Sequence, residues 1–343
     1  MYKSKIMALS LMGLIGLSSI GCATNTMQST TAHLAAQKPL NTQDLMAHLT
    51  VLEKIAKEHG GNRAIGTEGG LLTAKYIDAY VREMGLDTSK LIFENRNKLV
   101  GQNLIVEIPG QSKDTAIIVG GHYDSVPNGP GINDNGSGVA VLLELIKYYA
   151  TQKEKPKHTL YFAFWDSEED GIGGSTDFVK NLSPKQLQGI QAYINLDMVG
   201  TKNPTIQIAD GDKSSIDEME NLFKANGASE ADYQPLIESL AQLPSHPKDQ
   251  QLEQYQRQFF QSKGITVKDD LTTLTASDTA PFLGKVPVTS FIFFNEQLKG
   301  NELEFAPCYH KACDTIDLVD AQSMQLSGEA VMNLIQKLST TTP

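Results

Sequence analysis

Beyond about residue 40, the chain alternates between two kinds of hydrophobic pattern. Apolar residues three or four apart, as at Leu45, Leu49 and Leu52, are typical of an amphipathic helix. Helices are predicted over residues 41–59, 71–84, 137–150 and 329–338. Short apolar runs predict strands over residues 104–108, 115–119, 159–165, 192–196 and 286–294. Strands that alternate with helices indicate a single α/β domain in which helices cover both faces of a sheet.

One long stretch, from about residue 214 to 263, breaks this alternation. It is polar, rich in Gln and Glu, and interrupted by Pro244 and Pro247. We expect a helical insertion outside the sheet, either a lid or a solvated surface excursion. The domain is therefore expected to span residues 39–343, with the insertion at about 214–263.

The amino-acid composition excludes several classes of protein. Of the 343 residues, 40% are hydrophobic and 20% are charged, which is ordinary for a globular domain and excludes a disordered, collagen-like or polytopic membrane chain. The chain has 29 basic and 40 acidic residues and a net charge of −11. An acidic chain without a dense basic run is a poor candidate for nucleic-acid binding, so no nucleic-acid partner is expected.

The first residues have the pattern of a signal peptide. Lys3 and Lys5 precede an apolar stretch over residues 6–20, which is too short for a comfortable membrane span. We expect a signal peptide over residues 1–21 and a flexible tether over 22–38, rich in Thr, Ala and Gln. The protein is therefore predicted to be exported.

Cys22 follows the apolar stretch directly. The pair Gly21-Cys22 resembles the cleavage box of bacterial lipoproteins, although Ser19 stands where an aliphatic residue is usual. Lipidation of Cys22 would anchor the protein on the periplasmic side of the bacterial cell envelope, its one expected membrane contact. The alternative is ordinary secretion with cleavage near Ala23.

Polar side chains that can bind metal follow several of the predicted strands. His122 and Asp197 each come directly after an apolar run, and Glu168 and Glu169 follow a third. Because open α/β sheets bind ligands beyond the carboxyl ends of their strands, these side chains should meet at one edge. Asp134 lies in a glycine-rich loop that opens a helix near the same edge, and His310 follows the last predicted strand after a loop.

This set has the chemistry of a metal centre. Imidazole and carboxylate ligands suit zinc, and two metal ions need about five protein ligands with one carboxylate shared between them. In a hydrolysis, two such ions can together stabilise the two oxygens at the reacting centre. Adjacent side chains of an extended segment point in opposite directions, so one of Glu168 and Glu169 can bind metal while the other serves as a general base. Taken singly, a histidine or carboxylate of this set is more often a surface or capping residue than a metal ligand.

Five segments together resemble the M28 zinc aminopeptidases, in the order and spacing of the bacterial leucyl enzymes. They are residues 121–125, 131–138, 165–171, 195–200 and 309–315, that is GHYDS, GINDNGSG, WDSEEDG, NLDMVG and YHKACDT. The resemblance covers the chain from about residue 41 to its end, apart from the insertion. It implies the zinc-exopeptidase fold, in which a central mixed, mostly parallel sheet is flanked by helices.

The resemblance also implies a role for each motif residue. His122 and Asp197 would bind one Zn²⁺, Glu169 and His310 a second, and Asp134 would bridge the two. Glu168 would be the general base that takes a proton from the metal-bound water. Tyr309 would hydrogen-bond the developing oxyanion.

Two further aspartates are candidates for support of the metal ligands. Asp124, two residues after His122, can orient that imidazole, although a local turn cap is the alternative. Asp278 lies in the segment SDTAPF, which resembles a family segment with histidine where this chain has Thr279. Loop structure alone is an equally good interpretation of Asp278.

Cys308 and Cys313 are predicted to form a disulfide. Export would place the chain in an oxidising compartment, and if Cys22 carries lipid these two are the only cysteines left to pair. The bond would bracket Tyr309 and His310 and hold that loop in ligand geometry. Two free buried thiols, or a cysteine that joins the metal site, remain as alternatives.

The sequence thus predicts a dizinc exopeptidase that hydrolyses the N-terminal bond of peptides with a free N-terminus. The same ligands serve carboxypeptidases and glutaminyl-peptide cyclases. A carboxypeptidase needs a cationic clamp, and the quoted motifs hold no arginine, although Arg63, Arg82, Arg96 and Arg257 stay unplaced. A non-catalytic binding protein on the same fold would be expected to have lost a ligand or the base, and neither is lost.

Overall fold

The computed structural model describes residues 40–299 and 302–340, and these described residues belong to one compact unit. The predicted signal peptide, the tether and the lipidation site Cys22 lie outside the described residues. No helix among those described has the length and apolar character that crossing a membrane requires.

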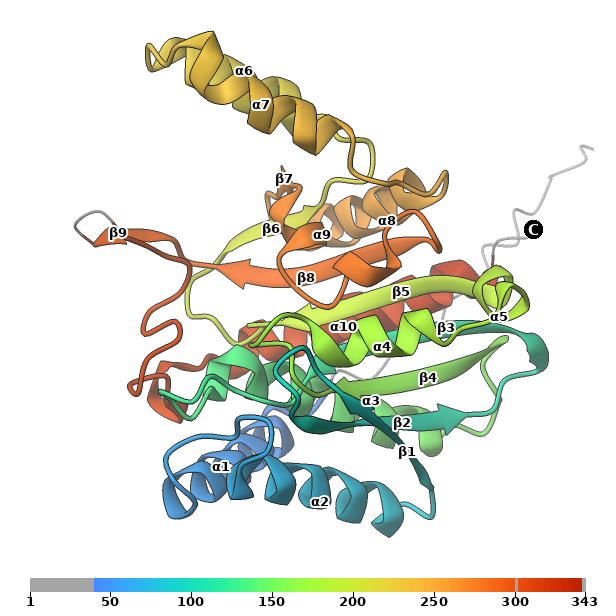
Figure 1. The fold of residues 1–343 in the computed structure, drawn as a ribbon. Coiled ribbons are helices and arrows are strands. Elements are labelled where there is room, and N and C mark those ends of the chain that lie inside the picture. Colours follow the sequence, from blue (N-terminus) through green and yellow to red (C-terminus); the bar gives the residue numbers. More distant parts are fainter. Residues whose placement is uncertain (1–39, 300–301, 341–343) are drawn as a thin grey trace, which may run out of the picture. The chain divides into compact units, whose positions relative to one another are not determined.

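Eight strands of the described chain form one mixed sheet in the order β1-β2-β4-β3-β5-β8-β6-β7 (Figure 1). The strands are β1 (Thr88–Glu94), β2 (Val100–Ile108), β3 (Ser112–His122), β4 (His158–Trp165), β5 (Ile190–Asp197), β6 (Thr205–Ala209), β7 (Lys268–Asp270) and β8 (Val288–Phe294). The central strands β4, β3, β5 and β8 run parallel, whereas β1, β2 and the β6–β8 pair introduce antiparallel neighbours. This confirms the predicted fold class. A separate hairpin joins β9 (Gln297–Lys299) to β10 (Glu302–Glu304).

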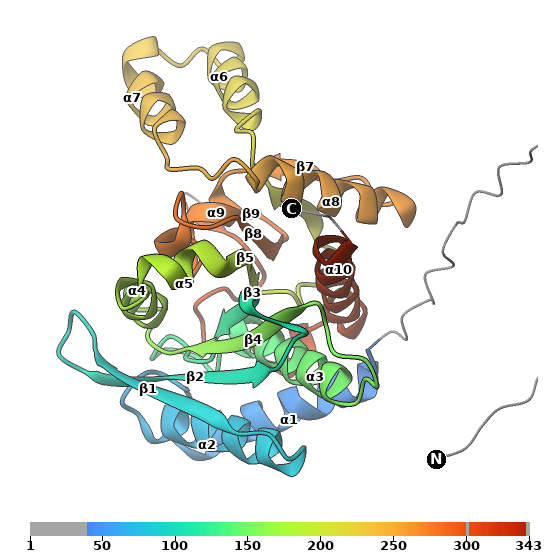
Figure 2. The ribbon, with the colours of Figure 1, turned by 90° about the vertical axis from the view of Figure 1, so that its right-hand side faces the viewer.

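The helices divide between the two faces of the sheet (Figure 2). Ile117 and Val119 of β3 belong to one buried core, and Ile118 between them belongs to another, as the period of two along a strand requires. The first core is closed by α1 (Thr42–Glu58), α2 (Glu68–Glu83), α3 (Gly138–Ala150), α8 (Asp249–Ser262) and α10 (Ala321–Thr340). The second is closed by α4 (Gly173–Lys180), α5 (Pro184–Gly189) and α9 (Thr272–Thr275). Helices α6 (Ser215–Ala225) and α7 (Glu230–Ala241) contribute residues to this core but project away from the sheet (Figures 1 and 2).

Local signals explain where the first two helices begin. The side chain of Asn41 caps α1 by accepting a hydrogen bond from the Gln43 amide at 2.9 Å. Helix α2 begins three residues before the predicted start because Thr67 caps it. Its first turn contains Gly69, where an added Cβ would lie 2.0 Å from the Asn62 carbonyl oxygen. The glycine permits this close approach, and it also hides the start of the helix from a hydrophobic pattern.

The predicted insertion needs one correction. Residues 214–263 are largely helical, as expected, but α8 is not outside the sheet. Its Phe260 is fully buried and meets Phe291 of β8 with ring centroids 6.3 Å apart. Helices α6 and α7 pack on each other, with the rings of Phe223 and Tyr233 stacked at 5.4 Å. The polar composition of α8 concealed a helix that covers the sheet.

Candidate functional site

Three neighbouring parallel strands carry the predicted site to one edge of the sheet. His122 is the last residue of β3 and pairs in register with Trp165, the last residue of β4. Glu168 and Glu169 follow β4 in a short loop, and Asp197 is the last residue of β5. The structure therefore brings together the side chains that the strand ends predict.

Asp134 lies between the two histidines of the site. It sits in the loop and irregular turn over Ile132–Ser137 that lead into α3. One carboxylate oxygen, Oδ1, is 3.3 Å from His122 Nε2, and the other, Oδ2, is 3.3 Å from His310 Nε2. The carboxylate thus faces two imidazoles from opposite sides.

Each histidine has a second carboxylate beside it. His122 Nε2 lies 3.5 Å from Asp197 Oδ1, and His310 Nε2 lies 3.1 Å from Glu169 Oε2. The five side chains therefore form two half-sites that share Asp134. The resemblance implied the same grouping of these five residues, and their role as zinc ligands stays a prediction.

The spacing and chemistry of these groups fit zinc. Ligand atoms about 2.0–2.1 Å from a tetrahedral Zn²⁺ lie roughly 3.3–3.5 Å from one another, close to the four distances above. In the described chain, Nε2 of buried His122 and Oδ1 of Asp197, which face each other at 3.5 Å, both lack a hydrogen-bond partner. Buried polar atoms are nearly always satisfied, and a cation bound between these two groups would satisfy both of them.

The pKa shifts of the site residues also favour a bound cation. Burial and the charge of Asp134 together raise the pKa of Glu169 to about 7, against the opposing effects of His310 and His122. Burial lowers the pKa of His310, but hydrogen bonds and charges from Asp134 and Glu169 outweigh it and raise the pKa to about 10. So many buried carboxylates in one place favour a bound cation.

Asp124 connects His122 to the loop of the two glutamates. Its Oδ1 lies 3.4 Å from His122 Nδ1 and accepts a hydrogen bond from the Glu168 amide at 3.1 Å. Its Oδ2 accepts one from the Glu169 amide at 3.4 Å. A single carboxylate thus lies beside one predicted ligand and holds the backbone of the predicted base, and its role in orienting His122 stays a prediction.

The carboxylate of Glu168 makes no hydrogen bond to another described residue. Glu168 lines the cavity beside the half-sites. Burial raises its pKa well above the ordinary value, the charge of His122 opposes this, and the carboxylates of Asp278 and Asp197 add to the rise. A carboxyl group with a raised pKa is a stronger base than an ordinary carboxylate, as a general base requires.

Tyr309 and Asp278 differ in how closely they approach the ligands. The Tyr309 ring lines the same cavity and stacks on His310 with centroids 3.7 Å apart. Asp278 is fully buried and accepts a hydrogen bond from Ser175 Oγ at 2.5 Å. It hydrogen-bonds to none of the five predicted ligands, so its supporting role stays a prediction.

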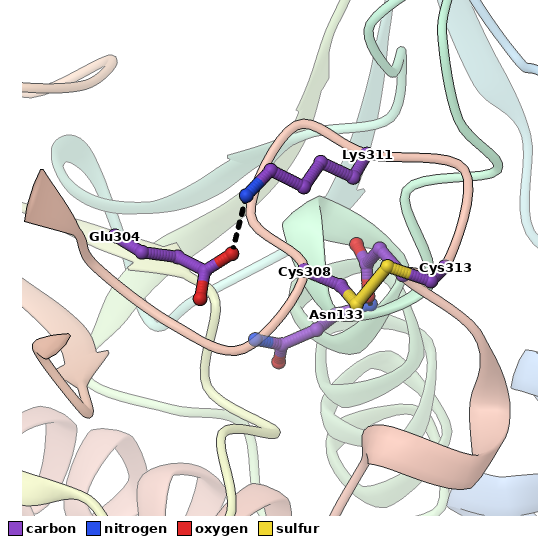
Figure 3. Close-up of a disulfide and its surroundings, with 6 residues drawn as sticks. Asn133, Glu304, Cys308, Lys311 and Cys313 are labelled. Atoms are coloured by element: carbon purple, nitrogen blue, oxygen red, sulfur yellow. Dashed lines mark hydrogen bonds and ion pairs between the residues drawn. A yellow bond between two sulfur atoms is a disulfide. The ribbon is translucent and has the colours of Figure 1, made fainter. Parts of the chain in front are cut away.

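The predicted disulfide between Cys308 and Cys313 is present, with Cα atoms 5.5 Å apart. Figure 3 shows it beside Asn133, the neighbour of Asp134 in the sequence. Inside the closed loop, Lys311 reaches Glu304 at 2.7 Å. Cys308 and His310 both have left-handed backbones, with φ of 64° and 57°, a conformation that side chains other than glycine rarely adopt. The closed loop supports this conformation at the histidine.

Asp314 supports the site through hydrogen bonds, although the sequence pattern gave it no role. It follows Cys313, and its two oxygens accept the backbone amides of Asn133 and Asp134 at 3.0 Å each. The disulfide loop is thereby tied to the turn that carries Asp134. The motif contains Asp314, but nothing local in the sequence shows that its partners lie about 180 residues away.

Arg63 is a second residue that the pattern left unplaced. Its side chain is fully buried and donates to the carbonyl oxygens of Pro130 at 2.9 Å, Gly131 at 2.6 Å and Tyr123. Its own amide donates to Ser125 Oγ at 2.8 Å. The guanidinium therefore fixes the loop between His122 and Asp134 and places a positive charge near their carboxylate neighbours.

The half-sites open into a cavity of about 420 Å³. One part of its wall carries the acidic groups and His310. Another part is apolar, formed by Ile172, Met198, Ala276, Ile292, Phe294 and Phe305. A cavity of this size and mixed character is typical of a site for a small ligand.

Comparison with known proteins identifies relatives of this chain. A family model described as peptidase family M28 matches residues 103–335. Leupeptin-inactivating enzyme 1 of Streptomyces exfoliatus is 29% identical over 300 residues, which cover 88% of this chain and 62% of that protein. An aminopeptidase of Pseudomonas aeruginosa (strain UCBPP-PA14) is 31% identical over 253 residues, 72% of this chain and 43% of that protein. The chain thus spans less than two thirds of the length of these relatives.

Solved structures share the fold at low sequence identity. BSAP, a zinc aminopeptidase from Bacillus subtilis, matches with a TM-score of 0.65 and 17% identity, over 89% of this chain and 96% of that one. A glutaminyl cyclase from an Acidobacteriales bacterium matches with a TM-score of 0.67 and 19% identity, over 94% and 99%. These likenesses support the fold, and the match of the family model over more than half of the sequence shows that the chain belongs to peptidase family M28.

Proposed function

We propose that the protein is a dizinc aminopeptidase that removes N-terminal residues from peptides. The observation that carries this proposal is the position of Asp134, whose two oxygens face His122 and His310 at 3.3 Å each. A shared carboxylate with a histidine and a further carboxylate on each side suits two zinc ions. The relatives named as aminopeptidases agree with it.

His122, Asp197 and Asp134 would hold one zinc ion, and Glu169, His310 and Asp134 the other. Bound there, zinc would supply Lewis acidity and lower the pKa of a water molecule. Glu168, which has no protein partner for its carboxylate in the described chain, would accept the proton and pass it to the leaving amine. The Tyr309 hydroxyl would donate to the oxyanion that forms on the scissile carbonyl.

The charge of the cavity supports an exopeptidase that recognises a free amine. Glu168 and Asp197 line the cavity and are the candidate acidic partners for an α-ammonium group. The apolar wall would receive the side chain of the first residue. We extend the proposal to export, with lipid attachment at Cys22 as the anchor.

The test uses zinc-loaded protein and three substrates. Leucine p-nitroanilide should be hydrolysed, its N-acetylated form should not, and chelation should abolish the activity until zinc is restored. Cleavage of both anilides at similar rates would contradict recognition of the free amine. Release of pyroglutamyl product from a peptide with N-terminal glutamine, without hydrolysis of the anilide, would instead identify a glutaminyl-peptide cyclase.

A further inference from the structure

Arg96 stands at the tip of the β1–β2 hairpin, where the hairpin meets the loop of the proposed base. Its two neighbours fix that tip. Asn95 Nδ2 donates to Asp170 Oδ2 at 2.6 Å and to Ser167 Oγ at 3.1 Å, and Asn97 Nδ2 donates to Asp170 Oδ2 at 3.2 Å. The residue between these two asparagines is therefore held beside the 166–171 loop by contacts that do not involve its own side chain.

The guanidinium of Arg96 lies against the backbone of this loop. A Cβ added at Gly171 would sit 2.4 Å from Arg96 Cζ and 2.7 Å from Nη1. Gly171 has φ of 116°, a conformation that residues with a side chain rarely adopt. The glycine therefore leaves the space in which the guanidinium rests, three residues beyond Glu168.

Arg96 has no ion pair or hydrogen bond through its side chain with any other described residue, and it is exposed. It nevertheless lines the cavity of about 420 Å³ that contains Glu168, Asp134 and Asp197. Among the described residues that line this cavity, it is the one lysine or arginine. An adjoining cavity of about 490 Å³ shares Gly171 and Ile172 and adds Lys180 and Lys285. In a chain of net charge −11, cations thus gather on this side of the site.

We infer that Arg96 binds a carboxylate on the part of the substrate that leaves, so that the enzyme prefers short peptides or peptides with an acidic second residue. The inference rests on the proposed function. The site would hold the α-ammonium of a dipeptide at its acidic end and the carboxylate at Arg96. A guanidinium presents a planar pair of donors that matches a carboxylate in a bidentate contact.

The experiment compares the dipeptide Leu-Gly with its amide, Leu-Gly-NH2, which differs only in the terminal carboxylate. For the wild type, kcat/KM should be higher for Leu-Gly by about two- to fivefold, the range expected of one exposed charge pair. In Arg96→Gln this ratio should fall to about one. A variant that loses activity on both substrates equally and keeps the ratio would show a structural role and overturn the inference.

Lys98→Gln is the matched control. Lys98 is an exposed cation on the same hairpin, it pairs with Glu94 at 2.9 Å, and it does not line the cavity. Removal of its charge should leave the ratio of Leu-Gly to Leu-Gly-NH2 as in the wild type. An equal fall of the ratio in both variants would assign it to general electrostatics and contradict a contact at Arg96.

A second pair of substrates separates the two sources of the carboxylate. Leu-Glu-NH2 and Leu-Gln-NH2 both lack a terminal carboxylate, so a preference for the first that depends on Arg96 would identify an acidic side chain as the ligand. A preference confined to Leu-Gly would identify the α-carboxylate. Absence of both preferences in the wild type would overturn the inference.

Acetyl-Leu-Gly keeps this inference distinct from the proposed function. If it is cleaved with dependence on Arg96 while Leu-Gly-NH2 and leucine p-nitroanilide are not, the enzyme is a carboxypeptidase. The proposed function would then be wrong and the carboxylate contact at Arg96 right. Leucine p-nitroanilide could instead be hydrolysed while Arg96 has no effect on any of the four peptides with a free amine. The proposed function would then be right and the carboxylate contact at Arg96 wrong.

Discussion

Replacing Asp314 with asparagine removes a contact that lies beside the proposed metal centre and is not part of it. The two carboxylate oxygens accept the amides of Asn133 and Asp134 at 3.0 Å each. An asparagine of the same shape offers one oxygen and one NH2 group, so one backbone amide loses its acceptor and faces a donor. The turn that carries Asp134 is then held by one hydrogen bond instead of two.

The size of the effect follows from the charge on the acceptor. A buried hydrogen bond to a charged group is worth about 1.5–3 kcal/mol, which corresponds to a factor of about 10–100 in an equilibrium constant. We expect Asp314→Asn to lower zinc affinity by this factor, the range typical of residues that orient metal ligands. Competition with a chromophoric zinc chelator at fixed pH, with the disulfide intact, measures it.

Asp317→Asn serves as the control, because Asp317 is an exposed acid three residues further along. It makes the same change of charge and should keep the zinc affinity of the wild type. A folded Asp314→Asn variant with zinc affinity within about twofold of wild type would refute the reasoning, since the hydrogen bonds to the Asp134 turn would then contribute nothing to the ligand geometry.

Three further predictions concern the same framework. Asp134→Ala should lose zinc from both half-sites, because one carboxylate faces both histidines; two zinc ions per chain by elemental analysis would contradict this. The double change Cys308→Ser/Cys313→Ser should weaken zinc affinity and activity more than it lowers the Tm of the zinc-free form, since closing so short a loop contributes only about 2 kcal/mol; a large loss of Tm with unchanged affinity would oppose it. Arg63→Met leaves three buried carbonyl oxygens without their donor. The free energy of unfolding, measured in urea, should therefore fall by about 3–5 kcal/mol. A fall of less than about 1 kcal/mol would contradict this.

The sequence predicted the centre of the sheet well and its edges poorly. Strands β3, β4 and β5 are continuous apolar runs because both of their faces are buried, and such runs are visible locally. Strand β1 was missed because most of its residues are exposed and it pairs on one side only. Helix α8 was misplaced because its Gln-rich surface outweighs the few apolar residues, such as Leu252 and Phe260, that reach the core.

Some residues of the site could likewise be predicted from local sequence patterns, whereas others could not. The proposed ligands lie at strand ends or in motifs with a fixed order, so a linear pattern can find them. Arg63 and Asp314 act through backbone groups that are 60 to 181 residues distant. Only the folded chain shows that these two residues and the turn of Asp134 meet, and no composition or spacing along the sequence carries that information.

Glu168→Gln, measured for zinc content and for turnover of leucine p-nitroanilide in the same preparation, tests the central claim most directly. The amide keeps the shape of the side chain and cannot accept the proton, while the five proposed ligands are untouched. We predict a folded protein with two zinc ions per chain and kcat lower by about 10²–10⁴, the contribution of a general base. Full activity with two zinc ions bound would show that Glu168 is not the base and contradict the account.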